Sequence, residues 1–481
     1  MDIKDFFIDP EGKNAEQIRK IGYEIVDLIV DTFSRLKDQP IFNYVPPKEL
    51  DHIFSNSIPE KKLTWNQLLD ELKEKVLKYS FYFGHPRYIG HMITQPSAPC
   101  IFLDALISAL NQSLFLWEVG PSAAHLERET IRWLCKLFGY KQGSGGMFLA
   151  GGSIANLTAL LIARNRAISE GKDISKFQVF CSEYSHFSVI KAVNFAGLSR
   201  ANLIQVSSDK NGKMDPDLLE SKIKESIDKN KLPLFVVATA GTTISGAIDP
   251  ISDISYVCRK YGVWLHVDAA HGGAVVFSKK YRSLLNGIKK ADSIAFDPHK
   301  WLYNSIPSAT ILLKREEDLN HLLFKAPYVE DPENEEGKRP NQGEAAIQGT
   351  RGFDALKLWA SMKLIGVDGL GKIVDHCIDL SKYLASLVKE KESLELIAYP
   401  EINIVCFRCL DKRGNNDSLN STVQKMLERQ GRAFLSIARF KGKKVLRAVI
   451  LNYCTKKEDI EFIIQEVLSL AKQIQQKGRL L

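Results

Sequence analysis

The 481-residue chain contains no long hydrophobic run. No apolar stretch approaches the roughly 20 residues of a membrane-spanning helix. The first five residues lack the basic and then apolar order of a secretory signal. We therefore expect no membrane partner and a cytoplasmic location. The sequence also shows no internal repeat and no low-complexity tract, so we expect no repeat architecture.

The basic residues do not form one continuous block, although the net charge is +8. Lysines cluster at 220–231 and 441–447, but acidic or apolar residues interrupt both clusters. A nucleic-acid-binding protein more often has a continuous basic face with interleaved aromatic residues, so we expect no nucleic-acid partner. The eight cysteines are scattered, and Cys406 and Cys409 have no second pair nearby, which favours buried thiols in a reducing compartment.

Hydrophobic periodicity divides the chain into three predicted parts. Residues 1–83 carry helical periods at 14–38 and 66–77, with Pro46, Pro47 and Pro59 between them. A helical arm without a core of its own must pack against something else, such as a second subunit. Residues 84–370 alternate between strand and helix, which predicts an α/β fold around a mostly parallel sheet. Residues 371–481 predict a small α+β domain.

Individual elements follow from short apolar runs and from helical periods. In the large domain we expect strands at 147–150, 178–181, 234–239 and 263–267, and helices at 153–168 and 250–261. In the small domain we expect a helix at 371–391, strands at 402–408 and 445–451, and helices at 417–429 and 457–475. Ligands of such sheets bind beyond the carboxyl ends of the strands, so polar residues at those ends carry most weight.

Two strand ends could hold a phosphate group. Gly151, Gly152 and Ser153 follow a predicted strand and open a predicted helix, where backbone N–H groups and the helix dipole attract anions. A glycine turn with Ser153 as an ordinary N-cap has the same pattern. The stretch 238–243 offers further hydroxyl groups at the end of another strand. Neither a P-loop nor a dinucleotide fingerprint is present.

Asp268 ends a strongly apolar strand, where a carboxylate is costly without a partner. A protonated pyridine nitrogen is one suitable partner, and we favour it. The carboxylate could instead cap the following turn. A metal site is the third interpretation, because His266 shares a strand face with Asp268 and His271 is close by.

Lys300 lies in the run Phe296-Asp297-Pro298-His299-Lys300-Trp301 and follows an apolar stretch. An ammonium group in apolar surroundings is poorly solvated, which favours the neutral and nucleophilic amine. Such an amine can form a Schiff base with an aldehyde cofactor. The alternative is a surface lysine that extends beside a tryptophan. A phosphate turn, a strand-end carboxylate and a lysine together are the minimum equipment for pyridoxal 5′-phosphate (PLP).

From about residue 15 to 470 the chain resembles the group II pyridoxal-phosphate decarboxylases. This family includes the aromatic-amino-acid, glutamate, histidine and diaminobutyrate decarboxylases. The resemblance rests on ordered motifs, namely His85-Pro86-Arg87-Tyr88, Gly151-Gly152-Ser153, Ser185-His186, His266-Val267-Asp268-Ala269-Ala270, Asp297-Pro298-His299-Lys300-Trp301 and Arg351-Gly352-Phe353-Asp354-Ala355-Leu356-Lys357.

The resemblance implies a fold-type I enzyme that uses PLP and no metal. It places the Schiff base on Lys300, the partner of the pyridine nitrogen on Asp268, and a ring-stacking histidine at His186. The remaining cofactor-binding residues that it implies are Gly152, Ser153, Thr242, Ala270 and His299. In the family a tyrosine on a mobile loop reprotonates the substrate carbon, and Tyr328 matches it within the loop 326–346.

The resemblance also implies decarboxylation of an L-α-amino acid to an amine and carbon dioxide. His91, Met92, Thr94 and Phe115 are expected near the substrate side chain. We expect an aromatic substrate first, a diamino acid second and glutamate third. A PLP-dependent aldehyde synthase or aminotransferase, a metal-dependent hydrolase and a non-catalytic interaction protein are the rival hypotheses. The family is dimeric, so we expect a homodimer with a shared active site.

Overall fold

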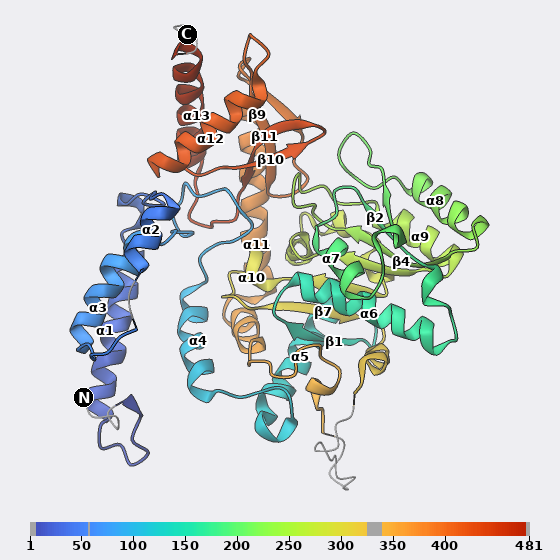
Figure 1. The fold of residues 1–481 in the computed structure, drawn as a ribbon, viewed down its shortest axis with the longest axis horizontal. Coiled ribbons are helices and arrows are strands. Elements are labelled where there is room, and N and C mark those ends of the chain that lie inside the picture. The colour runs from blue at the N-terminus through green and yellow to red at the C-terminus, as the bar shows by residue number, and fades with distance from the viewer. Residues whose placement is uncertain (1–5, 56–57, 325–338, 478–481) are drawn as a thin grey trace.

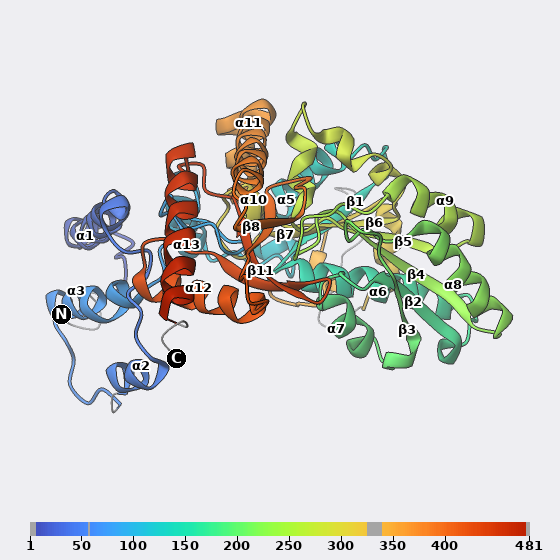
Figure 2. The same ribbon diagram turned by 90° about the horizontal axis from the view of Figure 1, so that it is seen from above.

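The computed structural model describes residues 6–55, 58–324 and 339–477. Its N-terminal helices lie beside the rest of the molecule in both views of the ribbon (Figures 1 and 2). These are α1 (Ala15–Phe33), α2 (Pro47–Phe54) and α3 (Trp65–Glu71), which continues as a π-helical segment at Leu72–Leu77. The two predicted helices of this arm are therefore confirmed. Helix α2 was not predicted, because the prolines between the two helical periods were interpreted as breaks. Pro47 instead occupies the first turn of α2, where its missing N–H removes no hydrogen bond of the helix.

The centre of the large domain is a seven-stranded sheet with the order β1-β7-β6-β5-β4-β2-β3. Only β7 runs antiparallel to its neighbours, so the predicted mixed and mostly parallel sheet is confirmed. The strands are β1 (Gly145–Leu149), β2 (Phe177–Ser182), β3 (Leu203–Val206), β4 (Leu232–Thr239), β5 (Trp264–Asp268), β6 (Ser293–Phe296) and β7 (Ala309–Leu313).

Helices cover both faces of this sheet, as Figure 2 shows. One core cluster joins the sheet to α5, α8, α9 and α11, and a second joins its other face to α6 and α7. The bounds are α4 (Ala98–Leu110), α5 (Pro121–Leu137), α6 (Gly152–Ser169), α7 (Ser188–Phe195), α8 (Pro216–Asp228), α9 (Ile251–Tyr261), α10 (Pro298–Trp301) and α11 (Ala355–Lys389). Burial on both faces explains why β4 and β5 read as continuous apolar runs.

The small domain packs α12 and α13 on a four-stranded antiparallel sheet of order β10-β11-β9-β8. The expected helix at 371–391 is the second of two helical segments of α11, which meet at Gly366 (φ 73°, ψ 164°) and end at Lys389. The second segment begins a few residues earlier than expected, directly after Gly366, where a positive φ favours glycine. The remaining elements are β8 (Leu394–Ala398), β9 (Ile404–Cys409), α12 (Asn416–Gln430), β10 (Ser436–Phe440), β11 (Lys443–Val449) and α13 (Lys457–Lys477).

We propose domain boundaries after residues 83 and 370, although α11 crosses the second boundary. Within the described ranges, no helix combines the length and hydropathy that a bilayer crossing requires. The parallel strands β4, β5 and β6 end side by side, since Thr239 pairs with Asp268 and Asp268 pairs with Ala295. The fold therefore gathers the residues that follow these strands at one edge of the sheet.

Candidate active site

A cavity of about 300 Å³ lies at the carboxyl edge of the parallel strands. This volume is within the range of small-molecule sites. Seven of the predicted cofactor and catalytic residues line the cavity, namely Gly152, Ser153, His186, Asp268, Ala270, His299 and Lys300. They come from four separate strand ends and the turns that follow them, so the fold alone brings them together.

Asp268 is the buried carboxylate of this cavity, with 6% of its surface exposed. Its Oδ2 atom accepts a hydrogen bond from Asn156 Nδ2 at 2.9 Å, and its Oδ1 atom accepts one from the backbone N–H of Ala270 at 3.2 Å. The second bond is the cap onto the following turn that the sequence allowed. Two donors stabilise the charged form, and each oxygen keeps a lone pair for a ligand.

The two histidines of the metal hypothesis point to other partners. Both ring nitrogens of His266 are engaged, Nδ1 with Ser293 Oγ at 2.8 Å and Nε2 with Asn156 Oδ1 at 2.9 Å. His271 stacks on Trp301 at 5.2 Å between ring centroids. Burial lowers the pKa of His266 to about 4 and that of His271 to about 3, so both rings are neutral. No three His, Cys, Asp or Glu side chains in the described part of the chain are grouped to hold a metal ion.

Lys300 lies in more polar surroundings than the sequence suggested. Its Nζ atom is 3.1 Å from Asp297 Oδ2, and 22% of its side chain is exposed. The expectation of an apolar pocket around this amine is therefore wrong. The reason is local, because Pro298 opens α10 and places residues 297 and 300 on one helical face. Asp297 is itself only 2% exposed, and its Oδ1 atom has no hydrogen-bond partner.

The turn before α6 forms a close cradle for an anion. A Cβ atom added to Gly152 would lie 2.9 Å from Asp297 Oδ2 and 3.1 Å from Ala270 Cβ, so only glycine leaves this space open. Ser153 is exposed in the first turn of α6, where helix N–H groups and the helix dipole favour a phosphate. The cradle, the buried carboxylate and the lysine together fit PLP.

Two hydroxyl residues differ from the expected arrangement of the phosphate site. Thr242 is fully buried, its Oγ1 atom lies 3.0 Å from Ser245 Oγ, and the same atom accepts the backbone N–H of Ala247. It does not line the cavity, whereas its neighbour Thr243 does. The turn after β4 therefore directs the hydroxyl of Thr242 toward other residues of the same turn and places Thr243 at the cavity.

His186 and His299 contribute imidazole rings to the cavity wall. His186 Nδ1 lies 2.8 Å from Ser188 Oγ, which orients the ring. His299 Nε2 is 3.7 Å from Asp297 Oδ2. Burial lowers the pKa of both histidines below the usual range, so their neutral forms are favoured near neutral pH.

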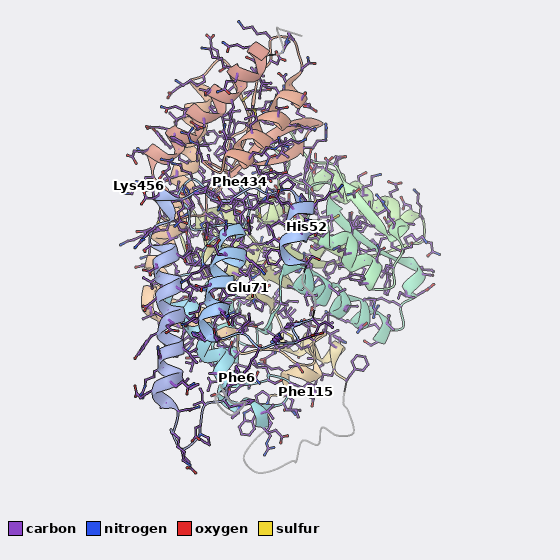
Figure 3. All side chains as sticks on the ribbon, turned by 60° about the vertical axis from the view of Figure 1, so that its left-hand side comes forward. Phe6, His52, Glu71, Phe115, Phe434 and Lys456 are labelled. Atoms are coloured by element: carbon purple, nitrogen blue, oxygen red, sulfur yellow. The ribbon has the colours of Figure 1, made fainter. Side chains whose placement is uncertain are left out.

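Of the four residues expected near the substrate side chain, Met92 lines this cavity, and His91, Thr94 and Phe115 do not. His91 is exposed, and its ring lies 5.7 Å from that of Phe434, while Thr94 is buried. The carbonyl oxygen of Phe115 accepts the backbone N–H of Gly343 at 3.1 Å, and Figure 3 shows Phe115 far from Phe434. Tyr328 lies outside the described residues.

Sequence reasoning missed Asn156, which also lines the cavity. An asparagine near the start of a helix has no distinctive pattern. Its importance becomes visible only where the fold brings α6 against β5. Thr239 belongs to the stretch 238–243 that was expected to offer hydroxyl groups, and it lines the cavity.

Comparisons with known proteins agree with this geometry. Residues 47–410 match the family model described as the pyridoxal-dependent decarboxylase conserved domain. An aromatic-L-amino-acid decarboxylase of Bacillus atrophaeus is 31% identical over 96% of this chain and 97% of its own length. An L-2,4-diaminobutyrate decarboxylase of Acinetobacter baumannii is 32% identical over 91% of this chain and 90% of its own.

A solved structure has the same fold over nearly the whole chain. It is the glutamate decarboxylase domain of diaminobutyrate-pyruvate transaminase and L-2,4-diaminobutyrate decarboxylase from Vibrio parahaemolyticus. The two chains superpose with a TM-score of 0.88 at 28% sequence identity, and 98% of each is covered. The chain therefore belongs to the pyridoxal-dependent decarboxylases, and it is a PLP-dependent carboxy-lyase that acts on an amino acid.

Proposed function

We propose that this chain converts an aromatic L-amino acid to its amine and carbon dioxide. The observation that carries the proposal is the convergence of Lys300, Asp268, His186 and the Gly152–Ser153 turn on one cavity. These residues supply an amine, a buried carboxylate, a flat neutral ring and an anion cradle, which are the four kinds of contact that PLP needs.

In this proposal Lys300 holds the aldehyde carbon of the cofactor, Asp268 the ring nitrogen, and the first turn of α6 the phosphate. When bound, PLP supplies an electron sink for the electrons that remain on the α carbon as carbon dioxide leaves. Asp268 keeps a proton on the ring nitrogen, because a buried carboxylate with two donors is a stable counter-charge. His186 offers a neutral ring face at the wall of the cavity.

Two further residues complete the proposed reaction path. Arg447 is buried and donates to the carbonyl oxygen of Thr243, a residue of the cavity wall, at 2.6 Å. Its guanidinium also donates to Ser436 Oγ at 2.9 Å and to the carbonyl oxygen of Gly90 at 3.3 Å. Arg447 does not line the cavity itself, but none of the described ion pairs joins it to a carboxylate, so we assign it to the α-carboxylate of the substrate. The role of Tyr328 as the acid that protonates the α carbon stays a prediction.

The cavity wall supports an aromatic substrate over glutamate. Apolar Met92 lines the cavity, and His91, its neighbour in the chain, belongs to an aromatic cluster with Tyr88 and Phe434. Among the described lining residues Lys300 carries the only formal positive charge, so a second substrate carboxylate has no free cation to pair with. The relative from Bacillus atrophaeus, an aromatic-L-amino-acid decarboxylase, supports the same choice.

A diamino acid is the second candidate substrate. Asp297 Oδ1 is buried at the cavity without a hydrogen-bond partner, and an oxygen of this kind can accept a second ammonium group. The diaminobutyrate decarboxylase from Acinetobacter baumannii supports this alternative.

A screen for carbon dioxide release tests the substrate directly. The purified holoenzyme is incubated with each of the twenty amino acids, and with diaminobutyrate and ornithine. We expect the highest kcat/KM with an aromatic amino acid and the amine as the product. The highest value with a diamino acid would overturn the aromatic assignment, and aldehyde with ammonia would identify an aldehyde synthase instead.

We further propose that two copies of this chain form a dimer with a shared active site. Helix α1 has no buried residue, and its apolar side chains Tyr23 and Val30 are exposed. An amphipathic helix gains most of its stability from packing, so a second copy is a suitable cover for this arm. Light scattering should give twice the mass of one chain. A single-chain mass at micromolar concentration would contradict the dimer.

A further inference from the structure

A continuous hydrogen-bond network lies behind the cavity, between β5, β6 and α6. Trp264 Nε1 donates to Ser293 Oγ at 2.9 Å, and Ser293 Oγ lies 2.8 Å from His266 Nδ1. His266 Nε2 is 2.9 Å from Asn156 Oδ1, and Asn156 Nδ2 donates to Asp268 Oδ2 at 2.9 Å. All five residues are buried, so each of these bonds is shielded from water.

The chemistry of the groups fixes the direction of every bond in this chain. The carboxylate of Asp268 only accepts, so Asn156 must turn its NH₂ toward it and its Oδ1 toward His266. His266 therefore carries its proton on Nε2 and accepts the hydroxyl proton of Ser293 at Nδ1. Ser293 in turn accepts from Trp264. Every donor points toward Asp268, and the neutral state of His266 agrees with a single ring proton.

A branch of the network reaches the second ring of the cavity. The other amide hydrogen of Asn156 is directed at Ser188 Oγ at 2.9 Å, and Ser188 Oγ lies 2.8 Å from His186 Nδ1. Because Ser188 accepts from Asn156, its own hydroxyl proton is free to be donated to His186 Nδ1, which also accepts the backbone N–H of Ser188 at 3.3 Å. The ring proton of neutral His186 is then on Nε2.

We propose that Asn156 is the positioning residue of this site, and that it orients the carboxylate of Asp268 and, through the Ser188 hydroxyl, supports the proton on Nε2 of His186. The inference rests on the proposed roles of Asp268 and His186. His266 prevents rotation of the Asn156 amide, because a turned amide would place oxygen against the Asp268 carboxylate and NH₂ against the His266 N–H. One amide thereby controls the two groups that face opposite parts of the bound cofactor.

Cofactor affinity measures this positioning without any turnover. Apo-protein is titrated with PLP, and binding is followed by the visible absorbance of the bound cofactor. In Asn156→Leu the buried carboxylate loses its charge-assisted donor, and we expect the dissociation constant to rise roughly 10- to 100-fold. Asn165→Leu is the matched control, since Asn165 is on the same helix and donates to the backbone oxygen of His321 at 2.9 Å. That control should bind PLP within about twofold of the wild type.

His266→Phe tests the network from a residue that does not line the cavity. The substitution keeps the flat ring and its stacking on Phe235, at 5.5 Å between centroids, but removes both hydrogen bonds. We expect weaker PLP binding, and we expect the His266→Phe/Asn156→Leu double variant to bind no more weakly than Asn156→Leu. Additive losses of PLP affinity in the double variant, or an unchanged affinity in His266→Phe, would contradict the proposal that His266 and Asn156 act together.

Asn156→Asp keeps the shape of the side chain and supplies a pH readout if Asn156→Leu fails to fold. At neutral pH two carboxylates face each other and PLP binding weakens, whereas on acidification the new acid takes up a proton and can donate to Asp268 again. We expect its affinity for PLP, relative to wild type, to recover as pH falls. A constant ratio across pH would contradict the positioning role. Failure of the wild type itself to bind PLP would instead refute the proposed site.

Discussion

The large sheet has a cavity at each of its two edges, and the proposed active site is the smaller of the two. At the amino edge a cavity of about 480 Å³ lies between the starts of β4 and β5 and the ends of α6 and α9. The carboxyl-edge cavity measures about 300 Å³. Both are rich in charged side chains. The amino-edge cavity is lined by the basic residues Arg166, Lys172, Arg259, Lys290, Lys314 and Arg315.

The difference lies in how the charges are held. At the amino edge Arg166 and Lys172 both pair with Glu170, and these side chains are about 40% exposed. Such pairs contribute at most about 1 kcal/mol each. At the carboxyl edge Asp268 and Asp297 are almost fully buried, and burying a charge is costly unless specific partners compensate. Buried carboxylates that need specific partners, rather than the volume of the cavity, therefore distinguish the carboxyl edge as the proposed site.

Replacing one lysine at each edge of the sheet with alanine should give the largest difference in turnover. Lys300→Ala removes the amine that holds the cofactor, so we expect turnover to fall below detection. Lys314→Ala is the matched control, because Lys314 lines the amino-edge cavity. Its kcat/KM should stay within about twofold of the wild type. Steady-state rates of carbon dioxide release decide the outcome, and a normal rate in Lys300→Ala would refute the assignment of the site.

Replacing one aspartate at each edge with asparagine should give the next largest difference in activity. Asp268→Asn leaves the shape of the cavity intact but removes the counter-charge for the ring nitrogen, so kcat/KM should fall roughly 100-fold or more. Asp292 lines the other cavity, and its Oδ2 atom accepts the backbone N–H of Leu265 at 2.9 Å. Asp292→Asn should lower the unfolding temperature with little effect on PLP binding. Equal losses of cofactor affinity in both variants would remove the distinction between the edges.

The pH dependence of stability reports on the buried network behind the active site. In the folded protein the pKa of His266 is about 4, against an ordinary 6.5. Below pH 6.5 the unfolded chain therefore binds a proton that the folded chain refuses, and stability falls as pH approaches 4. His266→Phe lacks this titration, so its deficit in unfolding free energy should shrink by about 2–3 kcal/mol between pH 7 and pH 4.5.

Denaturant unfolding of the two apo-proteins at both pH values measures that difference. His85, His271 and Asp249 also have shifted pKa values, but they are present in both proteins and their contributions cancel. A deficit that does not change with pH would mean that His266 takes up a proton as readily in the folded state as in the unfolded chain.

The smallest effect is expected for an ion pair at the amino edge. Arg166→Ala removes the contact to Glu170 Oε1, 3.2 Å away, on an exposed face of α6. An exposed pair at this helical spacing contributes about 0.3–0.5 kcal/mol, so both stability and kcat/KM should change little. A loss of activity beyond about fivefold would show that the larger cavity takes part in the reaction.

Site residues could be predicted from the sequence where a charged side chain directly follows or ends an apolar run. Asp268 at the end of an apolar strand and Lys300 after another were both recognised for this reason, and both line the cavity. Parallel strands buried on two faces gave equally clear runs, so most strands of the large sheet could be predicted. β8 and β10 were missed because their residues are partly exposed and their apolar signal is diluted.

The rest depended on tertiary contacts that a local pattern does not contain. Asn156 and His266 are 110 residues apart and meet only because α6 packs on β5. Thr243 lines the cavity in place of the expected Thr242. The turn after β4 decides which of the two residues faces the cavity, and the apolar pattern of the strand does not predict the conformation of that turn. Gly366 separates the two helical segments of α11, and both segments contribute residues to the core of the large domain, which a local pattern does not reveal.

The central proposal is that Lys300 holds the cofactor at the carboxyl edge of the sheet. The most direct test is to reduce the PLP-loaded protein with borohydride, which makes the link between cofactor and lysine permanent, and then to map its peptides by mass spectrometry. We predict that the added mass of the reduced cofactor is on the peptide that contains Lys300. A label on another lysine, or no stable label at all, would contradict the account.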